Sequence, residues 1–329
     1  MRAAPLPPAA RLRYRPARMS TPEKPPRRTT DIDAPLDAAA SRERLVGIAL
    51  MCAALFCFSG LDASAKWLGQ DLPTLQVVFA RYLGAMLLVC AVVNPVTTPG
   101  VVRSRRPALQ VLRSLFLLGS TLLNFLALRW LQLAETMAIM FSTPFLVALI
   151  AGPLLGERVG PRRLAAIVVG FLGVLVVVRP GLEGFQPASL LSLGAAFSNA
   201  LYGVTTRMLA GTDSSRTTLL YSGLAGLAVT APIAPFVWEA PASALAWAAL
   251  AGLGALGAVG HWLLILAHAR APASVLSPYF YTQIVWMLAL GWLIFGDLPD
   301  AGTLVGAFIV VGSGLYLIAR ERARARVVR

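Results

Sequence analysis

Charged residues are scarce in this chain, and their scarcity excludes most soluble folds. Only 13% of its 329 residues are Asp, Glu, Lys or Arg, while 57% are hydrophobic. A soluble domain has about 25% charged residues. The composition is therefore typical of an integral membrane protein.

The signatures of several enzyme classes are also missing from the sequence. It has two His and three Cys, with no Walker A sequence, no Cys/His metal spacing and no serine nucleophile elbow. Gly252, Gly254 and Gly257 match G-x-G-x-x-G, but they lie inside an apolar run and lack the acidic residue that a dinucleotide site has about 20 positions on. We expect these glycines to form a packing face. The sequence predicts no metal and no cofactor, and it excludes ATP-driven transport by this chain.

Long apolar runs are what the sequence has in abundance. A membrane-spanning helix needs about 17–25 predominantly apolar residues. Ten runs approach or reach that length, and the connections between them are too short for a soluble domain. The sequence therefore predicts an all-α integral membrane protein of ten transmembrane helices. The predicted spans are Leu45–Ala65, Thr74–Val93, Pro107–Leu128, Glu135–Leu155, Arg163–Val178, Ala188–Leu209, Arg216–Val237, Ala242–Ala267, Pro272–Phe295 and Ala301–Ala319.

The formal net charge of +14 does not indicate nucleic-acid binding, because the basic residues follow the predicted topology. Lys and Arg near span ends concentrate on the cytoplasmic side of a membrane. With the N-terminus inside, only Lys66, Arg129 and Arg179 would lie outside. This predicts a protein of the inner (cytoplasmic) membrane with both termini cytoplasmic, in contact with membrane lipid. The predicted inner set is Arg42, Arg44, Arg103, Arg105, Arg106, Arg158, Arg162, Arg163, Arg207, Arg216, Arg270 and the tail 320–329.

The chain repeats itself. The stretch from Gly156-Glu157 to Val178 recurs from Gly296-Asp297 to Ile318, 140 positions later. Each copy holds five predicted spans, and an odd number of crossings inverts the second copy relative to the first. Inverted repeats are typical of alternating-access transporters. The predicted parts are a disordered cytoplasmic tail (1–44), two five-helix repeats (45–181 and 187–319) around a central cavity, and a basic cytoplasmic tail (320–329).

Each copy contains a segment that resembles a known family. The segment Leu131–Gly181 resembles the EamA repeat of the drug/metabolite transporter superfamily, with a small-residue entry into the fourth span, Pro144, Gly156-Glu157 and a Gly-rich fifth span. The segment Ala271–Asp300 resembles the branch that contains metabolite and S-adenosylmethionine uptake permeases. The resemblance covers about Leu45 to Ala319. It implies ten spans in two inverted halves, with export or exchange of small metabolites.

Two charged residues are predicted inside spans, near the outer side. A charge within a span costs about 2.5–3.5 kcal/mol on insertion scales, so each needs a physical reason. One hypothesis pairs Asp62 with Arg81 across the first helix hairpin, at the mouth of the cavity. The alternative pairs Asp62 with Lys66, four residues on in the same helix, and lets Arg81 reach outward. The sequence leaves both open.

Other polar residues inside the spans are candidates for a substrate site. His261 is the only histidine predicted well inside a span, and with Asp62 it is a candidate for proton coupling; a polar packing role is the alternative. Neutral polar residues among aromatics suit a cavity for a small polar molecule, although helix–helix contacts would also use them. The substrate-binding candidates are Asn124, Ser142, Asn199, Tyr202, His261, Tyr281 and Gln283.

Prolines and glycines predict further features of the helices. Pro144 and Pro278 are expected to break the fourth and ninth spans, which marks a binding site or hinge in many transporters or else a static kink. Gly302 and Gly306 have the GxxxG spacing that lets helices approach closely. We expect a monomer, or a homodimer through the last span.

The leading hypothesis is a secondary transporter. It would move a small polar or amphipathic metabolite, such as an amino acid, a nucleoside or an S-adenosylmethionine-like molecule, by alternating access. An integral-membrane lipid-modifying enzyme would need carboxylates or histidines at one membrane face, whereas Glu157 and Asp297 are predicted on opposite faces. A non-transporting membrane subunit would have a uniformly apolar interior, which the polar set argues against. No catalytic residue is predicted.

Overall fold

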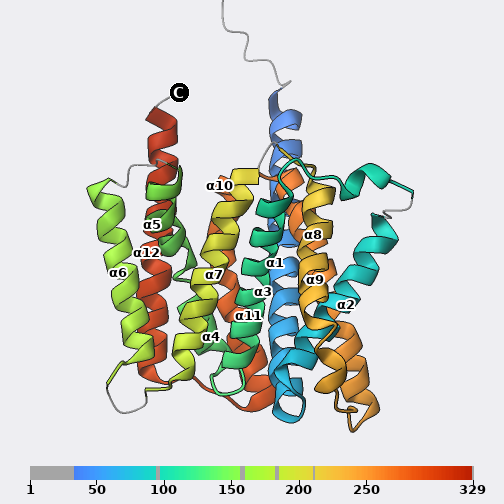
Figure 1. Ribbon diagram of the computed structural model, residues 1–329. Helices are drawn as coiled ribbons and strands as arrows, with labels where there is room; N and C mark the ends of the chain where they lie inside the picture. The colour runs from blue at the N-terminus through green and yellow to red at the C-terminus, as the bar shows by residue number, and fades with distance from the viewer. Residues whose placement is uncertain (1–32, 94–96, 156–159, 182–184, 210–211, 328–329) are drawn as a thin grey trace, which may run out of the picture. The chain divides into compact units, whose positions relative to one another are not determined.

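The computed structural model describes residues 33–93, 97–155, 160–181, 185–209 and 212–327. Within these ranges every regular element is helical. By its contacts the chain divides into residues 1–40 and 41–329. The described part of the first unit is the start of helix α1, and all other helices belong to the second unit (Figure 1).

The helices follow the apolar runs. In a membrane each backbone N–H and C=O must find its partner inside the protein, and a helix provides that partner locally. Proline begins α3 and α6, where its missing N–H is not needed. The α-helices are α1 (Asp33–Asp71), α2 (Thr74–Val92), α3 (Pro107–Ala127), α4 (Leu133–Met140), α5 (Thr143–Leu155), α6 (Pro161–Val178), α7 (Ala188–Leu209), α8 (Ser215–Thr230), α9 (Ala244–Arg270), α10 (Ala273–Leu276), α11 (Gln283–Leu290) and α12 (Ala301–Val327). Short elements are the 3₁₀ helices η1 (Pro99–Val102), η2 (Ala234–Phe236) and η3 (Ser277–Thr282) and the π-helix η4 (Gly291–Phe295).

Seven helical segments of the described chain are long and apolar enough to cross a membrane. They support a multi-pass membrane protein. Of the other three predicted spans, α6 has only the shorter apolar stretch Leu164–Val178, and neither α7 nor α8, which has 16 residues, is among the seven. Ten crossings therefore stay a prediction.

Several helix ends differ from those predicted. The tail 1–44 is not disordered throughout, because α1 begins at Asp33 in an alanine-rich stretch that favours helix. The last helix continues to Val327, through most of the predicted tail. The predicted seventh span is shorter, because Pro232 and Pro235 cannot continue α8 beyond Thr230.

The fourth and ninth spans are broken, as the two prolines predict. The fourth consists of α4 and α5, separated at Phe141 and Ser142. The ninth passes from α10 through η3, which contains Pro278, to α11 and then η4. Breaks in corresponding spans of the two copies free backbone groups in both halves of the bundle.

Corresponding helices of the two halves pack against each other. The pairs in contact include α2 with α8, α4 with α11 and α6 with α12. In each pair the two helices run in opposite directions (Figure 1). The third helix of one half also packs on the second of the other, since α3 contacts α8 and α9 contacts α2. This is the pattern that a two-fold relation between antiparallel halves produces.

Small residues set the spacing between these helices. A Cβ on Gly254 of α9 would lie 2.4 Å from Cα of Gly84 in α2. A Cβ on Gly306 of α12 would lie 2.7 Å from the carbonyl oxygen of Gly173 in α6. Gly306 of the last span thus packs against α6 within the chain, and the oligomeric state stays a prediction.

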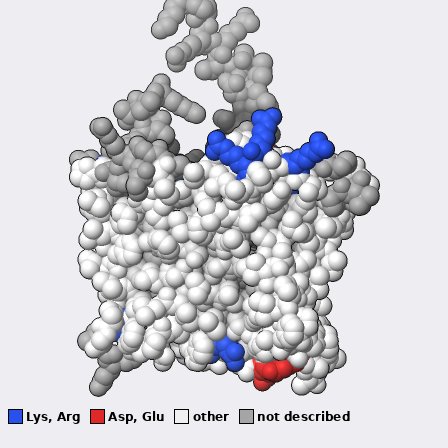
Figure 2. Space-filling view, in the orientation of Figure 1, with Lys and Arg blue, Asp and Glu red and all other residues white. Residues whose placement is uncertain are grey.

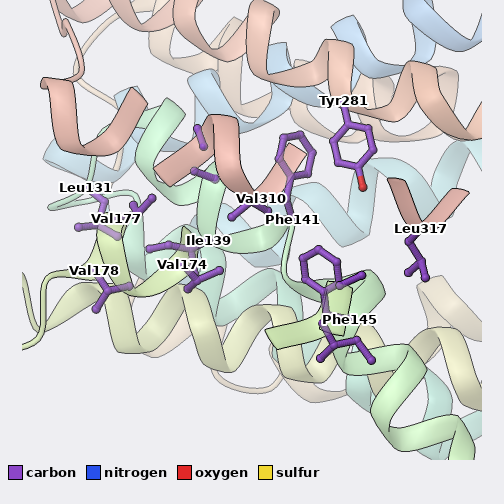
Figure 3. Packing of buried hydrophobic residues seen from close by; sticks show 14 of the residues in the cluster. Leu131, Ile139, Phe141, Phe145, Val174, Val177, Val178, Tyr281, Val310 and Leu317 are labelled. Atoms are coloured by element: carbon purple, nitrogen blue, oxygen red, sulfur yellow. The ribbon is translucent and has the colours of Figure 1, made fainter. Parts of the chain in front are cut away.

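A buried apolar cluster joins α4, α5, α6 and α12 (Figure 3). Phe145 of α5 is fully buried, with its ring over Gly170 of α6. Val174 of α6 and Val310 of α12 complete the contact between these two helices, which are the fifth and tenth predicted spans. This cluster forms one side of the bundle.

The outer surface separates apolar and charged residues. Many large apolar side chains are exposed, Phe308 at 79% among them, as expected for a lipid-facing surface and not for a soluble one. On the face shown in Figure 2, charged residues lie at the two ends, and the surface between them is uncharged. We name these ends by two aspartates: the Asp213 end, where α8 begins, and the Asp297 end, where α12 begins.

Candidate functional site

A cavity of about 410 Å³ lies among α3, α7, α8 and α9 at the Asp213 end. We call it the Arg113 pocket. Arg113 is six residues from the start of α3 and His261 nine residues from the end of α9, or about 9 and 14 Å along their helices. The pocket therefore reaches toward the middle of a hydrocarbon core about 30 Å thick. Its polar lining consists of Arg113, Tyr202, Thr206, Asp213, Thr218, Ser222 and His261.

Arg113 forms hydrogen bonds to four other residues of the pocket lining. The residue is 3% exposed. Its Nε donates to the Thr206 hydroxyl (2.7 Å) and its Nη2 to the Tyr202 hydroxyl (2.8 Å). Its Nη1 donates to the Ser222 hydroxyl (2.8 Å) and to the Thr218 carbonyl (3.2 Å). One guanidinium thus ties α3 to both α7 and α8.

The interaction of Arg113 with Tyr202 is also aromatic. The guanidinium carbon lies 4.5 Å from the centre of the Tyr202 ring, within the range of a cation–π contact. The ring therefore holds the cation from one side while its hydroxyl accepts a hydrogen bond. Such a fixed, planar cation is suited to binding a planar anion or a polar group of a ligand.

Sequence reasoning missed Arg113. It lies inside a predicted span, as Asp62 and Arg81 do. The free-energy cost of a charge in the membrane therefore indicates a specific partner for Arg113 as well. The signal was the spacing of Gln110, Arg113 and Ser114, which are three and four residues apart and share one face of a helix. All three are buried.

Asp62 and Arg81 interact electrostatically, although each makes its hydrogen bond to α3. Asp62 accepts a hydrogen bond from Asn124 (3.1 Å), and Arg81 donates to Thr121 (2.8 Å). Arg81 also lies over the ring of Tyr82 (5.0 Å), and a charge pair between Asp62 and Arg81 stays a prediction. The alternative partner of Asp62, Lys66, pairs with Asp297 instead.

Two of the seven predicted substrate-binding residues, Tyr202 and His261, line the Arg113 pocket. The Nδ1 atom of His261 is buried and has no hydrogen-bond partner among the described residues, and its ring packs edge-on against Phe58 at 5.0 Å. Asn124 binds Asp62 instead.

The remaining predicted binding residues lie elsewhere. Tyr281 is buried in the apolar cluster of Figure 3, 4.9 Å from the ring of Phe141 and against Gly314. Ser142 is fully buried at the break between α4 and α5. Asn199 and Gln283 are half-buried outside the pocket lining.

Two ion pairs join the halves at the Asp297 end. Lys66 of α1 contacts Asp297 at 2.5 Å, with side chains 10% and 26% exposed, and its Nζ lies 4.7 Å from the Phe295 ring centre. Arg179, which ends α6 in a left-handed conformation (φ 50°), pairs with Asp300. Both pairs link a basic residue of the first half to an acid of the second. Glu157, the predicted counterpart of Asp297, lies outside the described residues.

The Asp213 end has a different connection between halves. Asp213, between α7 and α8, accepts hydrogen bonds from the Ser104 hydroxyl, the Arg105 backbone N–H (2.9 Å) and the Gln110 side chain (2.9 Å). These bonds, that from Ser104 foremost, hold the pKa of Asp213 below its usual value. At the Asp297 end the corresponding link is neutral, between the Gln76 amide and the backbone of Glu239.

Replacing Asp213 with asparagine should therefore destabilise the protein in a pH-dependent way. Because the folded-state pKa is depressed, the carboxylate stabilises the fold above its unfolded pKa of about 3.9. We expect the variant to unfold at a lower temperature than the wild type at pH 7, by a small margin since Asp213 is partly exposed and asparagine keeps one acceptor oxygen. The difference should shrink as the pH falls below about 4. Thermal unfolding in detergent across pH measures this, and a pH-independent difference would contradict it.

Comparison with known proteins adds to this geometry. Residues 45–179 and 186–320 each match the EamA-like transporter family. The chain is 28% identical over 284 residues to an S-adenosylmethionine uptake transporter of Rickettsia felis, covering 86% of this chain and 96% of that protein. It is 26% identical over 285 residues to a riboflavin transporter of Vibrio cholerae, again covering 86% and 96%.

Two further comparisons agree with these. A pseudopaline exporter of Pseudomonas aeruginosa is 27% identical over 272 residues, covering 80% of this chain and 93% of that protein. A chain of a solved crystal structure covers 87% of this chain and 98% of its own length with a TM-score of 0.58. At 20% identity this last likeness is one of fold.

Proposed function

The chain belongs to the EamA-like transporter family, and from this premise we propose that it is a secondary transporter whose substrate site is the Arg113 pocket. The observation that carries the proposal is the contrast between the two ends. One end has a polar pocket. At the other end ion pairs join the halves, and the cavity beside Arg179 there, of about 450 Å³, has an apolar lining apart from that arginine. A site exposed to one side at a time is what alternating access requires.

The proposed topology has ten spans in two inverted five-helix repeats around a central cavity. The antiparallel packing of corresponding helices supports it (Figure 1). The low apolarity of α7 and α8 fits as well, because these helices supply Tyr202, Thr206, Thr218 and Ser222 to the pocket.

The proposed location is the inner membrane, with both termini cytoplasmic. Described arginines at helix ends favour it: Arg103, Arg207 and Arg270 flank helices at the Asp213 end, whereas Arg129 and Arg179 flank helices at the Asp297 end. Together with the other basic residues near the Asp213 end, this distribution matches a cytoplasmic Asp213 end. The pocket then faces the cytoplasm in this conformation.

The transport step would exchange one set of contacts between the halves for another. Opening of the Asp297 end requires Lys66 to leave Asp297 and Arg179 to leave Asp300. Closure of the Asp213 end over a bound substrate would bring α8 and α9 toward α3. The broken fourth and ninth spans supply the hinge positions.

The substrate is proposed to be a small polar or amphipathic metabolite. A volume of about 410 Å³ is in the usual range for small-molecule sites. Relatives named for S-adenosylmethionine, riboflavin and pseudopaline support this class, and they include both uptake and export. Transporter relatives that cover most of the chain favour this function over a lipid-modifying enzyme or a non-transporting subunit.

Purified full-length protein in liposomes tests the proposed function. We expect at least one labelled metabolite of this class to equilibrate across the membrane faster than in protein-free liposomes. An imposed pH gradient should change that flux if Asp62 or His261 couples transport to protons, and Asp62→Asn or His261→Gln should then remove the pH effect alone. No flux of any metabolite, together with a covalently altered lipid, would defeat the proposal in favour of an enzyme.

A further inference from the structure

Arg113 is a buried cation whose charge is not balanced by its own contacts. Arginine stays protonated in proteins, and an ion held away from water without an opposite charge is costly. The acceptors around Arg113 are all neutral: the hydroxyls of Thr206, Ser222 and Tyr202 and the carbonyl of Thr218. The pocket wall at Arg113 is therefore positively charged, while the carboxylate of Asp213 lies elsewhere in the same lining.

Asp213, the carboxylate in the pocket lining, is engaged elsewhere. Its Oδ1 accepts from the Arg105 backbone, and its Oδ2 from Ser104 and Gln110. The Gln110 amide also donates to the Thr218 hydroxyl (3.1 Å). Asp213 thus connects the loops at its own end, and it makes no ion pair with Arg113 among the described residues.

Polar groups in the pocket retain capacity for a ligand. Arg113 donates four hydrogen bonds, whereas a guanidinium has five N–H groups. The Tyr202 hydroxyl accepts from Arg113, and its own hydrogen has no acceptor in the described part of the chain. The buried Nδ1 of His261 also lacks a partner there. These three side chains line one cavity.

Building on the proposed transport function, we propose that the Arg113 pocket selects substrates that carry a carboxylate. The carboxylate binds the guanidinium of Arg113 and accepts the hydroxyl hydrogen of Tyr202. One carboxylate oxygen accepts the free N–H on Nη2 of Arg113, the other accepts the Tyr202 hydroxyl hydrogen, and one negative charge balances one arginine. A phosphate dianion would leave one charge unbalanced. The rest of the molecule occupies the remaining cavity toward His261.

The test compares the binding of acids with that of matched molecules that lack the acidic group, on the full chain in nanodiscs. The pairs are nicotinate and nicotinamide, methionine and methioninamide, and S-adenosylmethionine and its decarboxylated analogue, with AMP and adenosine as the phosphate pair. Binding is measured by thermal stabilisation and titration for wild type, Arg113→Gln, Arg113→Lys, Tyr202→Phe and the matched control Arg129→Gln, an exposed arginine at the Asp297 end.

We expect one or more carboxylic acids to raise the unfolding temperature of the wild type, whereas their amides and the decarboxylated analogue do not. Arg113→Gln should weaken acid binding by about 30-fold or more, as for a truncated buried charge pair. Arg113→Lys should weaken it less, Tyr202→Phe by about 3–10-fold, as for one lost hydrogen bond, and Arg129→Gln not at all. AMP should bind no better than adenosine.

Four results would overturn the inference. Equal binding of acids and amides, or preferred binding of AMP, would do so while leaving the transport function intact. Unchanged acid binding in Arg113→Gln would do the same, and if that variant does not fold, unchanged binding in Tyr202→Phe decides. Wild-type protein that neither binds nor transports any member of the panel would defeat the inference together with the proposed function.

Discussion

Gly254→Ala is expected to abolish most of the folded protein. The added Cβ would lie 2.4 Å from Cα of Gly84, so α2 and α9 would have to separate along their contact. Overpacking against side chains costs about 1–3 kcal/mol, and here the obstacle is backbone, which cannot rotate away. We expect a loss of about 3 kcal/mol or more, measured as the yield of monodisperse protein and its unfolding temperature.

Gly252→Ala is the matched control, two residues earlier in the same helix. A Cβ at Gly252 meets nothing within 4 Å. Because alanine favours helix over glycine by about 1 kcal/mol, this variant should be as stable as the wild type or slightly more so. Similar behaviour of the two variants would show that α2 and α9 do not approach closely at Gly84.

Asp297→Asn is expected to weaken closure of the Asp297 end. The side chain of Lys66 is 10% exposed, so the change leaves an ammonium with little water and without its ion-pair partner, although Glu135 still interacts with it electrostatically. Breaking a buried pair costs about 3–5 kcal/mol; since Asp297 is 26% exposed, we expect about 2–3 kcal/mol. The unfolding temperature should fall, and the reactivity of a single cysteine introduced in the pocket should rise from the Asp297 side.

Asp300→Asn serves as the control for this effect. Its pair with Arg179 is more exposed, at 55% for the Asp300 side chain, and exposed pairs contribute about 0–1 kcal/mol. Asparagine can also still accept, at its Oδ1, the hydrogen bond that the Thr303 N–H donates at the start of α12. The double variant Lys66→Asp/Asp297→Lys should recover part of the loss. A swap that recovers nothing would mean that the pair does not hold the halves together.

Much of the fold could be predicted from the sequence because a membrane simplifies the problem. Apolar length predicts the helices, and the breaks at Pro144 and Pro278 follow from the missing proline N–H. The family resemblance is confirmed. The helix ends were less predictable, since α1 and α12 extend beyond the apolar runs into polar stretches that also favour helix.

The candidate site was only partly predictable, because side-chain pairing depends on which helices become neighbours. Asp62 lies four residues from Lys66, yet Lys66 pairs with Asp297, which is 231 residues away. Tyr281 has the same polar character as Tyr202, but the first packs in the apolar cluster and the second holds Arg113. Periodicity places a residue on a helix face, whereas only the packing of α3 against α7 and α8 identifies the face that lines the pocket.

The polar character of α7 and α8 has a consequence for biogenesis. Neither helix is among the segments that are long and apolar enough to cross a bilayer by themselves, and their polar side chains bond to Arg113 of α3, which is synthesised earlier. Membrane insertion of the second half is therefore expected to depend on the first half already being in place. Arg113 would then bind Thr206 and Ser222 as α7 and α8 insert, and so direct the assembly of the second half against α3.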